Sequence, residues 1–140
     1  MIKTWHLVLL LLIVVIGTNI IEMVQINKVE DGSDFFKLEE LQADRFHTTV
    51  MSGTSCVLFY SDESDLCKKM ESNLGSLKNE TKNKAKFYKL NIEKYPGEYG
   101  EYDISGVPSV LIYKDGREVK RVLGVVPSSN LNMIINRVEL

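Results

Sequence analysis

Ser64 and Cys67 are the residues whose types and spacing come nearest to a redox site. They lie three positions apart, after the apolar run Cys56–Tyr60 and a short polar turn. A thiol in the first turn of a helix has its thiolate stabilised by unpaired amides and by the helix dipole. Disulfide exchange, however, needs an attacking thiolate as well as a second thiol that resolves the mixed disulfide. Because a hydroxyl occupies the outer position, the sequence does not predict a standard disulfide oxidoreductase.

Other chemistry at this turn is weaker still. The neighbouring acids Asp62, Glu63 and Asp65 disfavour a thiolate, and they are expected to cap the helix and complement its dipole rather than to bind a metal. His47 is distant in the sequence, so a hydrolase built on a serine nucleophile is improbable. Neither a metal nor a cofactor is expected.

Cys56 begins the apolar run that ends at Tyr60. At about 3.3 Å per residue it would lie about 13 Å from the polar turn, which exceeds the reach of a disulfide to Cys67. We therefore expect Cys56 to be a buried core thiol. Two cysteines are also too few for a disulfide framework.

The composition fits one globular domain with a short appendage. The chain has 140 residues, of which 44% are hydrophobic and 26% are charged, and its formal net charge is −2. This balance gives no support to a nucleic-acid partner. The lysines between the middle helix and the strand that follows it are read as a solvated helix end and loop; they are Lys78, Lys82, Lys84, Lys86 and Lys89.

The appendage is an N-terminal apolar segment. Residues 4–21 contain no Asp, Glu, Lys or Arg, and the run is close to the about 20 residues that span a bilayer. An uncleaved signal-anchor is favoured over a cleaved signal peptide, because Val15 and Ile16 before Gly17 are not small residues. Lys3 before the run and acidic residues after it place the domain outside the cytoplasm. The expected organisation is an anchor at 1–21, a linker at 22–34 and a domain at 35–140, with secretion after cleavage as the alternative.

Apolar spacing predicts the elements of the domain. We expect a strand at 36–41, a helix at 44–50, a strand at 56–60, a helix at 64–77, a strand at 86–92, a helix at 95–102, strands at 109–113 and 118–123, and a final helix. Pro127-Ser128-Ser129 is a capping signal at the start of that last helix. Asp115-Gly116 signals a tight hairpin turn, whereas Gly75 is a weak point inside a helix. The order βαβαβαββα indicates a layered α/β domain whose last pair of strands is antiparallel.

That order resembles the thioredoxin fold, a central mixed sheet flanked by helices, and the motifs are similar as well. The stretch 59–68, F-Y-S-D-E-S-D-L-C-K, is similar to F-W-A-E-W-C-G-P-C-K of the thioredoxin family, and 102–109, Y-D-I-S-G-V-P-S, is similar to Y-G-I-R-G-I-P-T. Lys114-Asp115-Gly116 and Gly124 match the hairpin and bulge glycines. The resemblance extends over residues 35–140, so we expect a thioredoxin fold after an N-terminal transmembrane segment.

The resemblance implies a cis Pro108, a Val107 backbone that can pair with an extended peptide, and a shielded Cys67. The chain departs from the family at the active turn. Ser64 stands in place of the attacking cysteine, and Leu58 stands in place of a buried aspartate that moves protons. In addition, Glu63 replaces a tryptophan, and Asp65 and Leu66 replace Gly-Pro.

Two functions remain open on this basis. The favoured one is a membrane-tethered, extracytoplasmic thioredoxin-like module with a degenerate active site, which binds partner polypeptides as an accessory or chaperone-like factor. Its binding residues would be Val107 and Pro108, with Glu63 and Asp65 beside them. The alternative is a one-cysteine protein of redox homeostasis, in which Cys67 forms mixed disulfides with a thiol-containing protein partner.

Overall fold

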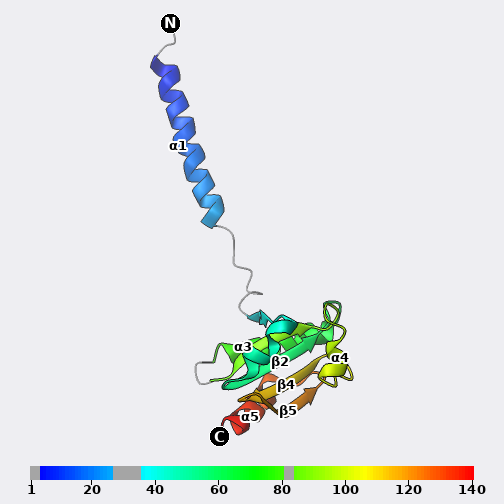
Figure 1. The fold of residues 1–140 in the computed structure, drawn as a ribbon. Helices are drawn as coiled ribbons and strands as arrows, with labels where there is room; N and C mark the ends of the chain where they lie inside the picture. Colours follow the sequence, from blue (N-terminus) through cyan, green and yellow to red (C-terminus); the bar gives the residue numbers. More distant parts are fainter. Residues whose placement is uncertain (1–3, 27–35, 81–83) are drawn as a thin grey trace. The chain divides into compact units, whose positions relative to one another are not determined.

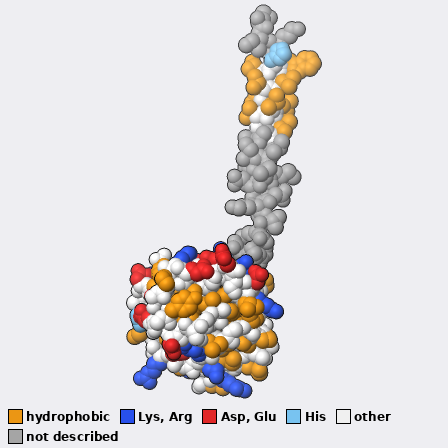
Figure 2. All heavy atoms as spheres, turned by 90° about the vertical axis from the view of Figure 1, so that its right-hand side faces the viewer, with side chains coloured by type: hydrophobic (Ala, Val, Ile, Leu, Met, Phe, Trp, Pro, Cys, Tyr) orange, Lys and Arg blue, Asp and Glu red, His pale blue; other side chains and the backbone are white. Residues whose placement is uncertain are grey.

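The computed structural model describes residues 4–26, 36–80 and 84–140, with the side chains of residues 17–26 left out. The chain divides into two compact units, Met1–Gly32 and Ser33–Leu140. Helix α1, Thr4–Ile26, belongs to the first unit. Its described apolar side chains, from Trp5 to Ile16, are exposed around the helix (Figure 2). Among the residues that the structure describes, no helix has both the length and the apolar character that crossing a membrane requires.

The second unit has the predicted order βαβαβαββα (Figure 1). Its strands form one sheet in the order β1-β3-β2-β4-β5, in which β1 and β3 run parallel to their neighbours and β4 is antiparallel to both β2 and β5. The elements are β1 Glu39–Glu40, η2 Ala43–Arg45, α2 Phe46–Val50, β2 Thr54–Tyr60, α3 Asp65–Lys78, β3 Lys86–Asn91, α4 Glu98–Glu101, β4 Ser109–Lys114, β5 Arg117–Leu123 and α5 Ser128–Glu139.

The central strand β2 separates two hydrophobic clusters. All seven of its residues are buried, as the continuous apolar run predicts for a strand covered on both faces. Because successive side chains point to opposite faces, Leu58 and Tyr60 join the cluster beneath α3 and α5, while Val57 and Phe59 join the cluster on the α2 side. The strand thus carries the chain through the middle of the core to the polar turn that precedes α3.

The hairpin between β4 and β5 forms as the Asp-Gly pair predicts. Lys114 pairs with Arg117, so the loop has two residues, Asp115 at φ +50° and Gly116 at φ +81°. Positive φ at both positions is the geometry of the tight turn that matches the twist of paired strands. The prediction of this turn is confirmed.

Three local predictions were wrong. The first strand was expected at 36–41 but pairs regularly only at Glu39 and Glu40, because the Leu38 amide donates to the Glu71 carboxylate instead of to a strand. Helix α4 has four residues rather than eight. At α5 the N-cap is Pro127, and no side chain caps the helix, so the expected capping by Ser128 or Ser129 does not occur.

Candidate functional site

Ser64 ends the polar turn and caps helix α3. Its backbone is extended, at φ −88° and ψ 114°, and its hydroxyl oxygen accepts a hydrogen bond of 3.3 Å from the Cys67 amide. Its carbonyl oxygen accepts the first helical bond, from the Lys68 amide at 3.1 Å. A serine oxygen is among the best acceptors for this position. At the position of the missing nucleophile, the hydroxyl therefore has a structural role that a serine fulfils well.

The acids of the turn do not act as one group. Asp65 lies in the first turn of α3, where a negative charge complements the helix dipole, and its carboxylate is 3.4 Å from the Lys68 ammonium. Glu63 is exposed. Asp62, which was expected to help cap the helix, instead accepts a hydrogen bond of 2.7 Å from the Asn91 side chain. The turn is therefore tied to strand β3 as well as to α3.

Cys67 is buried, with 1% of its surface exposed, and lies in the same cluster as Leu58, Tyr60 and Met70. This burial agrees with the shielding that the resemblance implies. Leu58 is fully buried too, so an apolar side chain fills the position at which the family pattern has an aspartate. Neither cysteine is in a disulfide. The described surroundings of the Cys67 thiol are thus largely apolar.

Cys56 is a core thiol, as predicted. It is fully buried at the other end of β2, and burial, followed by the nearby Glu139 carboxylate, raises the pKa of its thiol to about 12. A thiol with so high a pKa is almost entirely protonated at neutral pH and is a poor nucleophile. Cys67 is therefore the better candidate of the two for any thiol chemistry.

The loop before β4 contains the cis peptide bond between Val107 and Pro108. Val107 packs against both hydrophobic clusters, and the Pro108 carbonyl accepts a hydrogen bond of 2.9 Å from the amide of Gly124, which has φ +74°. Leu123 lies opposite Ser109 in the register of β4 and β5 and is 59% exposed. An exposed apolar side chain therefore borders the Pro108 loop.

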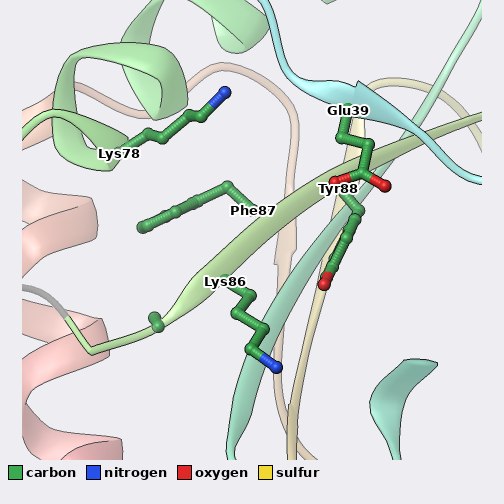
Figure 3. Close-up of a pocket in the computed structure, with 6 residues that line it drawn as sticks. Glu39, Lys78, Lys86, Phe87 and Tyr88 are labelled. Carbon is green, nitrogen blue, oxygen red and sulfur yellow. The ribbon is translucent and has the colours of Figure 1, made fainter.

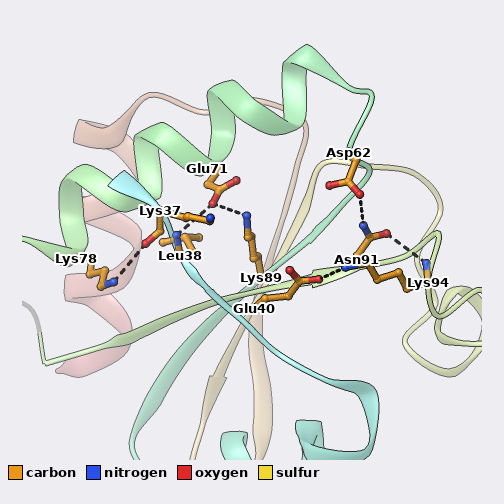
Figure 4. A network of polar contacts seen from close by, with 9 residues as sticks. All are labelled: Lys37, Leu38, Glu40, Asp62, Glu71, Lys78, Lys89, Asn91 and Lys94. Carbon is orange, nitrogen blue, oxygen red and sulfur yellow. Dashed lines mark hydrogen bonds and ion pairs between the residues drawn. The ribbon is translucent and has the colours of Figure 1, made fainter. Parts of the chain in front are cut away.

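A polar network behind the turn was not predicted from the sequence (Figure 4). Asn91 is fully buried; its amide group donates to Asp62, and its side-chain oxygen accepts from the backbone amides of Glu93 and Lys94, at 2.9 and 3.3 Å. Ser61 donates to the Glu93 carboxylate. Asn91 therefore holds the turn before α3 against the loop after β3.

An ion pair between the buried Lys89 and the half-buried Glu71 lies next to this network. The Lys89 ammonium is 2.8 Å from the Glu71 carboxylate and 4.8 Å from the centre of the Tyr60 ring. Only 7% of Lys89 is exposed, so its grouping with solvated lysines was wrong. The alternation of side chains along β3 could have predicted that Lys89 is buried. Phe87, Lys89 and Asn91 lie on one face of the strand, and that face packs beneath α3.

One pocket lies away from these residues. It has a volume of about 300 Å³, and Figure 3 shows Lys78 and Lys86 on either side of Phe87 within it. Its other lining residues are Glu39, Ala85 and Tyr88. None of the residues at the active turn or the Pro108 loop lines this pocket, so it is not part of the candidate site.

Within the described ranges, the side chains offer neither a metal site nor a serine activated by a histidine. No group of three or more His, Cys, Asp or Glu side chains there could hold a metal ion. His47 pairs with Glu101 at 3.3 Å and links α2 to α4, while the Ser64 hydroxyl is engaged with the Cys67 amide. The site consists of a capped helix N-terminus, a buried thiol and a cis-proline loop.

These features define a protein of the thioredoxin fold whose outer active-site position holds a serine. The thioredoxin family profile matches residues 37–137, and the chain therefore belongs to the thioredoxin family. It is 29% identical over 97 residues to a thioredoxin of Chlamydia caviae, covering 69% of this chain and 94% of that one. A thioredoxin of Staphylococcus aureus is 28% identical over 92 residues, covering 66% and 88%. The structure of a mutant thioredoxin from Halobacterium salinarum has a TM-score of 0.68 at 20% identity, covering 75% of this chain and 93% of that one.

Proposed function

We propose that this protein is a membrane-tethered, extracytoplasmic member of the thioredoxin family that binds partner polypeptides without turnover, as an accessory or chaperone-like module. The single observation that carries the proposal is the engagement of the Ser64 hydroxyl as the cap of α3, at the position where the family pattern has its attacking cysteine. A hydroxyl cannot begin disulfide exchange. The loop with the cis Val107–Pro108 peptide bond, in contrast, is retained and supports the binding role.

Binding would occur at the Val107–Pro108 loop, where an extended peptide can pair with the Val107 backbone. The exposed side chain of Leu123 beside this loop offers apolar contact. Glu63 and Asp65, both exposed, would contact the partner at the edge. Backbone pairing combined with side-chain contacts is a common mode of peptide recognition.

Fluorescence anisotropy with reduced, carboxymethylated lactalbumin, an unfolded polypeptide without free thiols, tests this proposal. The full-length protein should bind the probe, and Leu123→Glu should weaken binding strongly, since it places a charge on the exposed position beside the Pro108 loop. Val119→Glu is the matched control, because Val119 is an exposed apolar residue on the same strand, β5. Equal binding by Leu123→Glu and the wild type would refute the proposed site.

The alternative function, a one-cysteine redox protein that acts through Cys67, is favoured by the retention of a free cysteine in the first turn of α3. In that case the thiolate would attack a partner disulfide, form a mixed disulfide and release the second partner sulfur as a thiolate, while a thiol from the partner or a small molecule would resolve it. Capture of a partner through Cys67, lost in Cys67→Ser, would establish this function in place of the first.

The membrane tether is a separate part of the proposal. Lys3 before an apolar run that contains no Asp, Glu, Lys or Arg, and the absence of small residues before Gly17, support a signal-anchor. Fractionation of cells that express the full-length chain tests it. Recovery in the membrane fraction after a high-salt wash would support the tether, whereas a soluble mature form that begins after Gly17 would show that the segment is a cleaved signal peptide.

A further inference from the structure

The segment Phe36–Glu40, here called the strap, lies directly against helix α3. A Cβ atom built on Gly75 of α3 would come within 2.0 Å of the Phe36 carbonyl oxygen and 2.7 Å of the Phe36 Cα. Contacts this close to backbone atoms leave room for no side chain larger than hydrogen. Glycine has a low helix propensity, but Gly75 lies where the strap crosses α3 and the backbone of Phe36 needs the space.

Two more side chains of α3 hold the backbone of the strap (Figure 4). The Leu38 amide donates to Glu71 Oε1 at 3.1 Å, and the Lys78 ammonium donates to the Lys37 carbonyl at 3.3 Å. Together with Gly75, these positions lie three and four residues apart and so share one side of the helix. The strap therefore follows α3 over two turns.

The other end of the strap reaches the elements behind the active turn. The Glu40 carboxylate lies 2.8 Å from the Lys94 ammonium, and burial, followed by the negative charge of Glu40, raises the pKa of the Tyr60 phenol. Tyr60 is the last residue of β2, and Lys94 is held by Asn91. The contacts of the strap thus fall on the helix that carries Cys67 and on the residues that fix the turn before it.

Regular strand pairing contributes little to holding the strap. Only Glu39 and Glu40 pair with β3, at the edge of the sheet. The Leu38 side chain, with 3% of its surface exposed, belongs to the same cluster as Cys67. Regular ladder pairing therefore secures only the Glu39–Glu40 end of the strap, and the rest of the strap depends on its contacts with α3 and on the buried Leu38 side chain.

We propose that the strap controls access to Cys67: while it is seated, α3 is fixed against the sheet and the thiol is closed off, and when it is released, the first part of the domain opens locally and the thiol becomes reachable. This inference rests on the alternative function given above, the one-cysteine redox protein that acts through Cys67, since it concerns access to that thiol. In this proposal the position of the strap determines whether the Cys67 thiol can react with a partner.

Native-state alkylation of the full-length protein with iodoacetamide, resolved for each cysteine by mass spectrometry, tests the proposal. Cys67 and Cys56 are both buried, but Cys56 lies in the central strand and reports global unfolding. In Gly75→Ala the new methyl group must displace the strap, while alanine itself favours the helix by about 1 kcal/mol. The matched control is Gly100→Ala in α4, where a Cβ meets nothing within 4 Å.

In Gly75→Ala the labelling rate of Cys67 should rise by about tenfold, whereas the rate of Cys56 should change by less than about twofold. Gly100→Ala should change neither rate. An unchanged Cys67 rate, or an equal rise at both cysteines, would overturn the proposal. The measurement needs no partner, so this outcome is distinct from a failure of polypeptide binding.

A second pair of variants decides the matter if Gly75→Ala does not fold. Lys78→Met removes the donor to the Lys37 carbonyl, while Lys86→Met alters a neighbouring lysine on β3 without touching the strap contact. Lys78→Met should raise Cys67 labelling by about threefold with Cys56 unchanged. Equal labelling of Cys67 in Lys78→Met and Lys86→Met would overturn the proposal.

Discussion

The side chains that helix α3 turns toward the core are uncharged in its first turn, whereas its later turns carry a carboxylate that pairs with a buried lysine. In its first turn, Ser64 and Cys67 meet through one neutral hydrogen bond, and Leu58 fills the adjacent core. Further along, Glu71 faces the buried Lys89 and also accepts the Leu38 amide. An apolar side chain, Leu58, thus fills the core position where the family pattern has a buried aspartate, whereas a buried lysine is paired with Glu71 where a helix, a strand and the strap meet.

The residues at the active turn thus depart from the family pattern while the thioredoxin fold is kept. The family pattern has a buried aspartate in the strand, at the position of Leu58. In this chain the carboxylate beside Lys89 is that of Glu71, on α3. A buried ammonium requires such a partner, because an unpaired buried charge is strongly destabilising. Glu71, the counter-ion of Lys89, therefore links α3 to strand β3 and to the strap.

The largest expected effect follows from breaking that pair. Glu71→Gln leaves the Lys89 ammonium buried without a carboxylate, and we expect the free energy of unfolding in urea to fall by about 3 kcal/mol. The double variant Glu71→Leu/Lys89→Met should lose less than Glu71→Gln, because no charge is left unpaired. If Glu71→Gln is as stable as the wild type, the later turns of α3 do not depend on the pair.

The next prediction reverses the chemistry of the first turn. Ser64→Cys restores two thiols three residues apart at a helix N-terminus, and insulin reduction should rise at least about tenfold over the wild type, equivalent to about 1.4 kcal/mol. The rescue should be partial, since Leu58, Glu63 and Leu66 still depart from the family pattern. A wild type that reduces insulin as fast as the variant would show that the missing thiol does not limit activity.

A smaller effect tests the capping role of the same residue. Ser64→Ala removes the acceptor for the Cys67 amide and should lower the free energy of unfolding by about 1 kcal/mol. Ser128→Ala is the matched control, because α5 has no side-chain cap, and it should be nearly neutral. Equal effects of the two substitutions would show that Ser64 does not stabilise α3.

The sequence could predict what local patterns and motif similarity determine. Periodicity placed the elements in the correct order, Asp115-Gly116 specified the hairpin, and the motif around Pro108 implied the cis peptide bond that the structure contains. These features depend on neighbouring residues. They are therefore readable from short stretches of sequence.

Contacts between distant segments could not be predicted. Glu71 and Leu38 are 33 positions apart, and nothing near Gly75 indicates that the Phe36 backbone rests on it. The short β1 has the same cause, since the Leu38 amide leaves the ladder for a side chain on α3. Lys89 looked solvated because its partner lies on another element.

The smallest expected effect concerns the strap and depends on pH. The hydrogen bond from Lys94 lowers the pKa of the Glu40 carboxyl, with further help from the Lys94 charge and against a smaller effect of burial. The folded-state pKa lies below the unfolded value of about 4.3, so this stabilisation is present above that pH and is lost as the pH falls through the folded-state pKa. Glu40→Gln should therefore cost stability at pH 7, and the cost should vanish once the pH is below the folded-state pKa.

The cost should be less than about 1 kcal/mol at pH 7, because the side chains of Glu40 and Lys94 are 41% and 56% exposed and solvent screens their attraction. Urea denaturation of the wild type and Glu40→Gln at several pH values measures the difference. Glu39→Gln, at the neighbouring exposed position of the strap, is the matched control for the loss of one carboxylate. If the cost of Glu40→Gln does not vary with pH, the ion pair with Lys94 does not hold this end of the strap. The Glu71–Lys89 pair on α3 would then be the ion pair that fixes the strap region.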